Sequence, residues 1–328
     1  MRIDIHSHFI PERFIEEVRK EPDRFGIQVE ENGDLEFFNH KEGFKYPLFR
    51  TFYDVSAKLQ DMEMKKLDMS VLSAPPTIFY YWSDLETTKL VCRIYNDSVS
   101  EFVRANPDRF AGMGIVPLND PDEAILELQR CHDELGLNAI ELGSHVEGVQ
   151  FDDRRFLPFF QKVEELDMLV FFHPYYLGNK KGLESYYLTN LLGNLIDTSV
   201  SISHIVFGGL LQKFPKLKLY FAHGGGFIPY QVGRLEHGHK VRAETKLNLE
   251  SSPTEDVRKL IFDTITFNPE ALKFLIETQG EDRVVLGTDF PFDMGDEDPI
   301  SLINSVKGLS VSQKRKIFGE NAARLLKL

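Results

Sequence analysis

The sequence MRIDIHSHFIPERF, residues 1–14, decides between two α/β folds. Its apolar run at residues 2–5 has the composition of a buried strand and leads straight into His6 and His8 without a single glycine. A doubly wound sheet that binds a nucleotide would carry a glycine-rich turn here, because its backbone must approach the phosphates closely. The segment therefore favours a (β/α)8 barrel of the TIM type over the open doubly wound sheet, which is the alternative.

Eight short apolar runs recur along the chain and support this choice. Segments with helical periodicity separate them, as in residues 86–107, where apolar side chains return every three or four positions. Apolar strands that alternate with helices indicate a parallel sheet covered on both faces, and eight such units close a barrel. The runs are RIDI (2–5), SVLSAPP (70–76), FAGMGIVPL (110–118), NAIELGS (138–144), MLVFFHP (168–174), LKLYFAHGG (217–225), LIFDTIT (260–266) and RVVLGTDFP (283–291).

The length of 328 residues fits one barrel domain over residues 1–328, with an insert at approximately residues 9–60. Two alternating runs surround an Asn-Gly turn at residues 27–40, which predicts a β-hairpin over the barrel mouth. The interval at roughly residues 174–204 is rich in aromatic residues and glycine, which predicts a substrate-covering loop with a short helix. Residue 1 is expected to begin the mature fold, because no cleavable leader is recognisable.

Composition excludes several classes of function. With 42% hydrophobic and 27% charged residues the chain has ordinary globular composition. Its net charge of −13 disfavours binding to nucleic acids and to anionic membranes, and no apolar run reaches the ~18 residues of a membrane span. Cys92 and Cys131 lie in amphipathic stretches without CxxC spacing, so we expect buried free thiols and a reducing, cytoplasmic location.

Histidine and aspartate side chains follow the predicted strands at the end where barrel enzymes build their sites. His6 and His8 are two residues apart on the first strand and can reach one ion from the same side. His173 ends the fifth strand and Asp289 follows the eighth. Together the four side chains predict a mixed nitrogen and oxygen site for one divalent ion, with Zn²⁺ expected and Mn²⁺ or Fe²⁺ as alternatives.

Three further residues are candidates at this end of the barrel. His223, before three glycines, is either a fourth imidazole ligand or a free acid–base group, because histidine is the side chain that most readily exchanges a proton at neutral pH. Arg234, on a predicted helix, can pair with a substrate carboxylate, unless it is a solvated partner of a neighbouring glutamate. Glu141 marks the place where a second metal would be sought, although a polar residue of the barrel top is the simpler interpretation.

Four motifs together resemble the amidohydrolase-related (amidohydrolase 2) family. They are IDIHSHFIP (3–11), FFHP (171–174), FAHGGGFIPYQVGR (221–234) and VVLGTDFPF (284–292), and the likeness runs nearly from end to end. The resemblance implies a (β/α)8 barrel, a single divalent metal and nonoxidative cleavage of a C–C bond.

The resemblance also implies roles for individual residues. His6, His8, His173 and Asp289 match the metal ligands, and His223 matches the histidine that acts in catalysis. Arg234 matches an arginine that reaches the site of the neighbouring subunit, which makes a homodimer the expected unit. A second carboxylate-binding arginine of the family has no single match, so Lys45 and Arg50 are both candidates.

A metal-dependent nonoxidative decarboxylase of a small unsaturated or aromatic carboxylate is therefore the leading hypothesis, with His223 and Asp289 in proton transfer. A hydrolase or hydratase that uses the same metal-bound water is the alternative within enzymes. A catalytically inactive barrel that serves as a binding protein is the third possibility. The anionic substrate would be attracted by the metal, because the acidic surface repels it.

Overall fold

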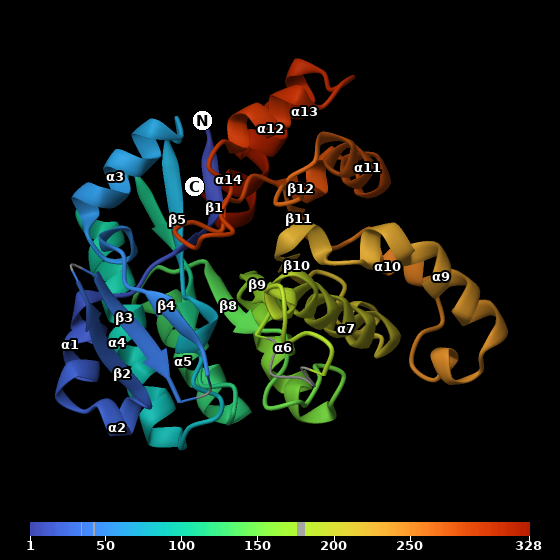
Figure 1. Cartoon of the computed structure of the whole chain (residues 1–328). Helices are drawn as coiled ribbons and strands as arrows, with labels where there is room; N and C mark the ends of the chain where they lie inside the picture. Colours follow the sequence, from blue (N-terminus) through green and yellow to red (C-terminus); the bar gives the residue numbers. More distant parts are fainter. Residues whose placement is uncertain (34, 42, 176–180) are drawn as a thin grey trace.

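A ring of parallel strands surrounded by helices forms the centre of the computed structural model, which describes residues 1–33, 35–41, 43–175 and 181–328 (Figure 1). Every one of the eight predicted runs contains a strand, and Met113 divides the third into two. The strands are β1 (Ile3–His8), β5 (Met69–Ser73), β6 (Phe110–Gly112), β7 (Gly114–Ile115), β8 (Ala139–Gly143), β9 (Leu169–His173), β10 (Lys218–Phe221), β11 (Ile261–Asp263) and β12 (Val284–Val285).

Backbone hydrogen bonds close the ring. The neighbouring strands pair in the orders β1-β5-β6 and β12-β11-β10-β9-β8-β7. The N–H of Met113 donates to the carbonyl of Leu72 at 2.9 Å and continues the pairing across the divided strand. The N–H of Ile5 donates to the carbonyl of Leu286 at 2.9 Å and joins the first strand to the last. The predicted (β/α)8 barrel is therefore confirmed.

Four helices begin at a capping residue followed by proline, a pattern that marks helix starts in the sequence. Asp120, Ser252, Asn268 and Asp298 accept hydrogen bonds from the backbone of the following turn, and a proline comes next in each case. The helices are α1 (Glu12–Lys20), α2 (Pro22–Phe25), α3 (Val55–Met64), α4 (Leu85–Ala105), α5 (Pro121–Asp133), α6 (Leu157–Glu165), α7 (Asn194–Phe207), α8 (Leu210–Lys213), α9 (Ile228–Val241), α10 (Pro253–Val257), α11 (Pro269–Gln279), α12 (Pro299–Ser305), α13 (Val311–Arg315) and α14 (Asn321–Leu326).

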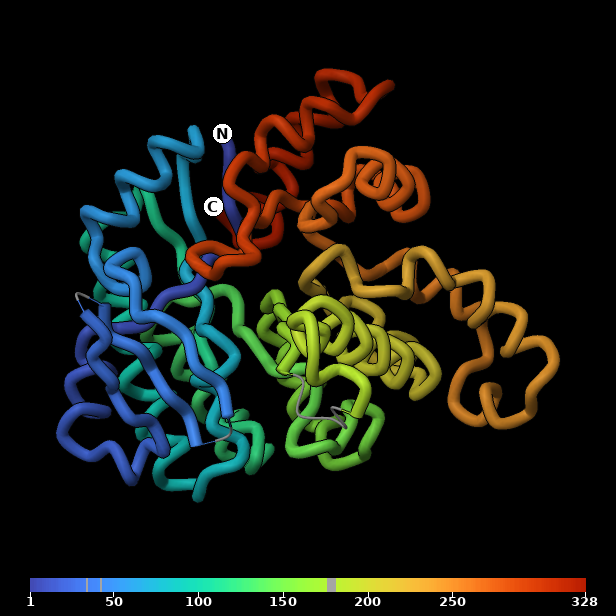
Figure 2. The backbone as a smooth tube through the Cα atoms, in the orientation of Figure 1, coloured from blue at the N-terminus to red at the C-terminus, as the bar shows by residue number. Residues whose placement is uncertain are grey.

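Two apolar layers hold the barrel together. The inner layer fills the ring with alternate strand residues, and the rings of Phe171 and Tyr220 stack there with centroids 4.3 Å apart. Leu325 and Leu326 of α14 pack against this inner layer. The outer layer lies between strands and helices, where Cys92 and Cys131 are buried free thiols as expected. Figure 2 shows α14, at the red end of the chain, beside β1 at the blue end.

The insert after β1 contains the predicted hairpin and one strand more. Strands β2 (Ile27–Asn32) and β3 (Leu35–His40) pair in antiparallel fashion, and β4 (Lys45–Pro47) adds a third strand that the sequence pattern did not indicate. Phe44 stacks on Tyr175 with ring centroids 5.2 Å apart, and Tyr46 packs edge-on against Phe292 at 5.5 Å. These two partners follow His173 and Asp289 closely in sequence, so the insert lies at the end of the barrel that carries the predicted site.

The predicted covering segment at residues 174–204 is described only in part, because residues 176–180 lie outside the described residues. Its described part contains a π-helical turn, η4 (Thr189–Gly193), that continues into α7. Across the described part of the chain, we find no helix with the length and apolar character to span a membrane.

Candidate metal centre

A β-bulge in β1 directs both histidines of the HSH sequence into the barrel. Asp4 pairs with Ser70 and Ser7 pairs with Leu72, so β1 carries one residue more than β5 over this interval. Because side chains alternate along a strand, an extra residue shifts the alternation and aims the following side chains to the other side. Ile3 and Ile5 belong to the inner layer before the bulge, and His6 and His8 point into the barrel after it.

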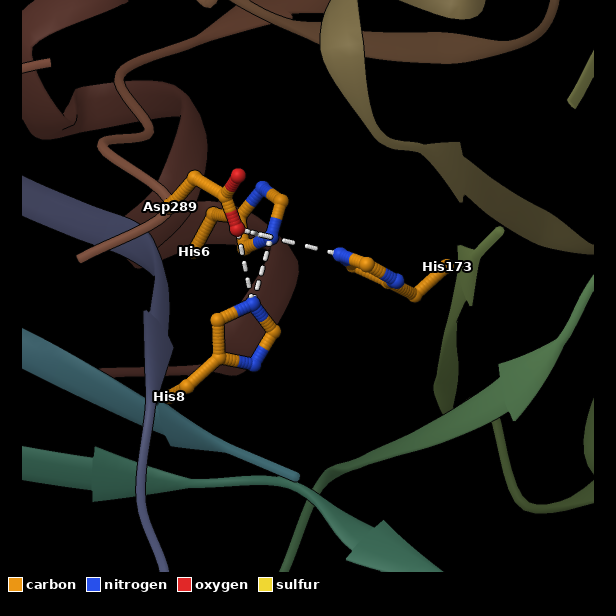
Figure 3. A group of neighbouring side chains, drawn as sticks. All are labelled: His6, His8, His173 and Asp289. Atoms are coloured by element: carbon orange, nitrogen blue, oxygen red, sulfur yellow. Dashed lines mark hydrogen bonds and ion pairs between the residues drawn. The ribbon is translucent and has the colours of Figure 1, made fainter. Parts of the chain in front are cut away.

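Four buried side chains meet at one point, as Figure 3 shows. The ligand atoms of His6, His8, His173 and Asp289 all lie within 4.8 Å of one another. Asp289 Oδ1 is 2.8 Å from His8 Nε2, 3.3 Å from His6 Nε2 and 3.8 Å from His173 Nε2. The three strand ends therefore bring the predicted ligand set together.

The other ring nitrogen of each histidine has an acceptor. His6 Nδ1 lies 3.1 Å from Asp263 Oδ2, and His8 Nδ1 lies 2.9 Å from the carbonyl of Ala74. His173 Nδ1 lies 2.9 Å from the carbonyl of Pro174. Partners of this kind hold the proton on Nδ1 and leave Nε2 as the donor atom toward a metal.

Burial sets the protonation of two of the ligands. It lowers the pKa of His8 to about 4 and the pKa of His173 to about 3, so both rings are neutral at pH 7 as a ligand must be. Burial acts to raise the pKa of Asp289, but its contacts with the surrounding histidines outweigh burial and hold this pKa well below its ordinary value. Burial acts to lower the pKa of His6 as well, but its contacts with Asp263 and Asp289 outweigh burial and raise this pKa to about 10. The site thus presents two neutral imidazoles and one carboxylate, and a bound cation would displace the proton of His6.

These residues fit a divalent cation. His173 Nε2 is completely buried and has no hydrogen-bond partner among the described residues, and it faces the point where the other ligand atoms meet. A buried polar atom without a partner is costly unless something binds it. Three imidazole nitrogens and one carboxylate oxygen form the donor set that suits Zn²⁺ and also Mn²⁺ or Fe²⁺.

His223 lies beside the ligand cluster but is not part of it. It begins the short turn η5 (His223–Gly225), and its Nε2 is 3.3 Å from Asp289 Oδ2, the carboxylate oxygen that faces away from His8. Its side chain is 13% exposed, whereas those of His6 and His8 are fully buried. Of the two roles left open by the sequence, this position favours the acid–base group.

The glycines after His223 are required by close packing. Gly225 has a φ of +77°, and a Cβ there would come within 2.4 Å of the Phe262 ring. A Cβ on Gly226 would come within 2.5 Å of the carbonyl oxygen of Leu195 on α7. The backbone can therefore fold sharply past β11 and α7 only without side chains at these positions.

Asp263 on β11 is the functional residue that sequence reasoning missed. It is fully buried and accepts hydrogen bonds from Tyr220 Oη at 3.1 Å and from the N–H groups of His223 and Gly224 at 3.0 and 2.8 Å, besides contacting His6. Burial acts to raise its pKa, but these contacts keep the pKa below its ordinary value. The available signal was an aspartate in the middle of the apolar run LIFDTIT.

A cavity of about 280 Å³ adjoins His223 and Asp289. Its wall combines residues after β11, the start of α9, and one side of η4 and α7. The described lining residues are Asn190, Leu191, Asn194, Leu195, His223, Gly226, Tyr230, Ile265, Thr266, Phe267, Asp289 and Met294. The cavity is large enough for a small organic molecule and is open to the predicted metal site on one side.

The predicted substrate-binding cations lie elsewhere in this single chain. Lys45 forms an ion pair with Glu30 at 2.5 Å, and Arg50 forms one with Asp54 at 2.6 Å. Arg234 is exposed on α9 and forms no hydrogen bond or ion pair with another described residue. None of the three lines the cavity in its described part, so their roles remain predictions.

Glu141 is buried in the barrel but does not belong to the ligand cluster. Its Oε2 accepts the N–H of Ala74 at 2.5 Å, and burial raises its pKa well above the ordinary value. A neutral carboxyl group is a poor metal ligand. The simpler interpretation, a polar residue of the barrel top, agrees with this placement.

The fold and the site define a barrel with a single-metal centre of three histidines and one aspartate. Comparison with known proteins places the chain in a family: a family model described as amidohydrolase matches residues 3–328, and the chain belongs to that family. The resemblance inferred from the motifs is confirmed.

Similar proteins include decarboxylases. A 2-amino-3-carboxymuconate-6-semialdehyde decarboxylase from Dictyostelium discoideum is 34% identical over 332 residues, which cover 100% of this chain and 92% of the relative. A gamma-resorcylate decarboxylase from Polaromonas sp. is 27% identical over 289 residues, covering 81% and 85%. The fold matches a crystal structure of 5-carboxyvanillate decarboxylase from Novosphingobium aromaticivorans with a TM-score of 0.86. The match covers 100% of this chain and 96% of that chain at 22% identity, and that structure is complexed with manganese and 4-hydroxy-3-methoxy-5-nitrobenzoic acid.

Proposed function

We propose that the protein is a metal-dependent, nonoxidative decarboxylase of a small unsaturated or aromatic carboxylate. The convergence of His6, His8, His173 and Asp289 beside a cavity that also exposes His223 carries this proposal. Full-length similarity to a decarboxylase at 34% identity supports the choice of reaction. Zinc is the ion we propose, with manganese as the first alternative because a structural relative is complexed with it.

The metal has a defined place and a defined purpose. The Nε2 atoms of His6, His8 and His173, together with Asp289 Oδ1, would hold it. When bound, the ion would supply positive charge that orients the substrate near its carboxylate and stabilises the electron pair left by bond cleavage. Asp263 keeps His6 oriented for this purpose through the 3.1 Å contact to Nδ1.

Proton delivery is the task of His223. In decarboxylation the C–C bond to the carboxylate breaks, CO₂ leaves, and the electron pair remains on carbon until a proton is added there. His223 Nε2 lies at the cavity wall and 3.3 Å from Asp289 Oδ2, so the carboxylate can hold the protonated ring in position. The N–H of His223 is anchored to Asp263, which fixes the backbone from which the ring projects.

We also propose a homodimer in which Arg234 enters the site of the second copy. Large apolar side chains, 37–40% exposed, gather on η4, α7 and the start of α9, and exposed apolar patches often mark protein–protein interfaces. Helices α7 and α9 pack against each other, and α9 extends away from the barrel at the right of Figure 2. The residues are Leu191, Leu192, Ile196, Val200, Phe227 and Tyr230.

This arrangement supplies the carboxylate anchor that the single chain lacks. The described lining of the cavity contains no lysine or arginine, and Arg234 has no partner among the described residues of its own chain. An arginine from a second copy would pair with the carboxylate in bidentate fashion. Lys45 and Arg50 remain secondary candidates, and a cytoplasmic location is proposed from the two free thiols.

The product formed from candidate acids tests the proposed reaction. The zinc- or manganese-loaded protein is incubated with 2,6-dihydroxybenzoate, 2-hydroxybenzoate and 2-amino-3-carboxymuconate-6-semialdehyde, and released CO₂ is measured alongside the organic product. We expect CO₂ and the product that lacks this carboxylate in equal amounts from at least one compound. A hydrated or hydrolysed product without CO₂ would instead favour the hydratase or hydrolase alternative.

A further inference from the structure

Two asparagine side chains line the cavity in the company of His223 and Asp289. Asn190 lies in the π-helical turn η4, and Asn194 is the first residue of α7. Both are half-buried. They are four residues apart along a continuous helical segment, so their side chains leave it on neighbouring positions of one face.

The amide groups of these two residues have no hydrogen-bond partner among the described residues, although both backbones are fixed. The N–H of Asn190 donates to the carbonyl of Tyr187 at 3.0 Å, and the N–H of Asn194 donates to the carbonyl of Thr189. Asp197, one turn further along α7, accepts the N–H of Tyr175 at 2.9 Å and ties this helix to the end of β9. The segment is thus held in place while both asparagines line the cavity.

Other asparagines inside this protein use their amides for structure. Asn96 Nδ2 donates to the carbonyl of Ile115 at 2.8 Å, and Asn321 Nδ2 donates to the carbonyl of Val284 at 2.9 Å. Asn190 and Asn194 differ from these residues, because their side-chain amides bond to no described residue and lie on a cavity wall. The π-helical turn that carries Asn190 is also an uncommon local structure, and such turns occur frequently at functional sites.

The charges around the cavity restrict what the amides can recognise. The positive charges of the proposed site, the metal and Arg234 of a second copy, are both assigned to the carboxylate region. Other substituents of the substrate would meet uncharged groups on the described wall, namely the amides, Thr266 and apolar side chains such as Ile265 and Met294. A carboxamide can donate and accept hydrogen bonds, so it suits a hydroxyl, a carbonyl or an amide.

We propose that Asn190 and Asn194 determine substrate specificity by binding an uncharged polar substituent on the edge of the acid that faces η4 and α7. This inference rests on the proposed function, because it assumes that the acid occupies this cavity with its carboxylate toward the metal. The substrate class is a planar acid that carries a hydroxyl, carbonyl or amide group in addition to its carboxylate. Acids with a methyl group or a second carboxylate at the same position bind more weakly.

Binding of matched acids to the manganese-loaded protein tests the proposal without requiring turnover. The probes are 2-hydroxybenzoates with a hydroxyl, methyl or carboxylate group at ring position 4 or 5, and Kd is measured by calorimetry. At one ring position the wild type should bind the hydroxyl acid about threefold to tenfold more tightly than its methyl counterpart, the range expected for one neutral hydrogen bond. Asn190→Leu or Asn194→Leu should remove this preference, since leucine has similar size and no hydrogen-bonding group.

Asn304→Leu is the matched control, because Asn304 is an exposed asparagine on α12 outside the cavity. It should keep the wild-type ratio of the two Kd values. The proposal is overturned if both cavity variants keep that ratio, if the wild type prefers no hydroxyl position, or if none of the acids binds. If the hydroxyl acid binds preferentially but no CO₂ is released, only the proposed reaction is contradicted. If CO₂ is released but no acid is preferred, only the proposed role of Asn190 and Asn194 is contradicted.

Discussion

Replacing Asp263 with asparagine removes one oxygen on which three parts of the site depend. Oδ2 of Asp263 lies 3.1 Å from His6 Nδ1, 3.1 Å from Tyr220 Oη and 3.0 Å from the N–H of His223. The remaining oxygen accepts the N–H of Gly224 at 2.8 Å and can keep that contact. The new NH₂ group cannot accept a hydrogen bond, so the three donors at Oδ2 lose their acceptor while they stay buried.

The expected cost follows from these lost contacts. A buried donor without a partner costs about 1–3 kcal/mol, so three of them predict a fall in the free energy of unfolding of about 3–6 kcal/mol, allowing for partial relaxation. The loss of the carboxylate that orients a ligating histidine typically weakens metal binding about 10–100-fold. The variant should therefore still bind metal, but with reduced affinity and stability.

Metal affinity is measured by competition with a chelator of known affinity, and stability is measured by urea denaturation of the metal-free protein. Asp256→Asn is the matched control: Asp256 is also a fully buried aspartate, but it pairs with Lys259 at 2.6 Å on α10, outside the ligand cluster. It should leave metal affinity unchanged. If Asp263→Asn binds metal as tightly as the wild type, the orienting role assigned to Asp263 is wrong.

Four other variants probe separate features of the protein. His173→Ala should abolish metal binding, whereas His223→Ala should keep the metal and lose about 10²–10⁴-fold in turnover; equal metal loss in both would make His223 a ligand. Arg234→Ala should raise KM. At substrate concentrations well below that KM, an equal mixture of subunits carrying Arg234→Ala or His223→Ala should recover about a quarter of wild-type turnover if the site is shared; no recovery would argue against sharing. Burial lowers the pKa of His40 from 6.5 to about 4, so the unfolded chain takes up a proton on this ring at a higher pH than the folded chain does. The corresponding part of the free energy of unfolding is therefore present above pH 6.5 and is lost as the pH falls toward 4. Urea denaturation of the wild type should show this loss, about 3 kcal/mol, and His40→Phe should lack it; an unchanged pH dependence in the variant would refute the assignment.

The sequence was sufficient for the barrel and for the ligand set because both depend on local patterns. Apolar strands in regular alternation with helices have few alternatives to a closed parallel sheet. The carboxyl ends of parallel strands meet on one face, so His173, two positions after Phe171 of the inner layer, was already aimed at the site. His6 and His8 were correct as a pair, because residues two apart share a face.

Features that depend on contacts between distant segments were not accessible in this way. The bulge between Asp4 and Ser7 is visible only when β1 is paired with β5, and simple alternation from Ile3 and Ile5 would have directed His6 away from the barrel. The role of Asp263 arises from donors on three other segments of the chain. The cavity likewise joins η4 and α7 to residues after β11, which are far apart in sequence.

The central claim is that one divalent ion, held by the four converging side chains, makes this barrel a decarboxylase. Its most direct test is CO₂ release measured while metal-free protein is titrated with zinc or manganese in the presence of an acid that the enzyme turns over. The account predicts that CO₂ release rises linearly to a plateau at one ion per chain, and that His173→Ala shows no rise. CO₂ release from the metal-free protein, or undiminished release from His173→Ala, would contradict it.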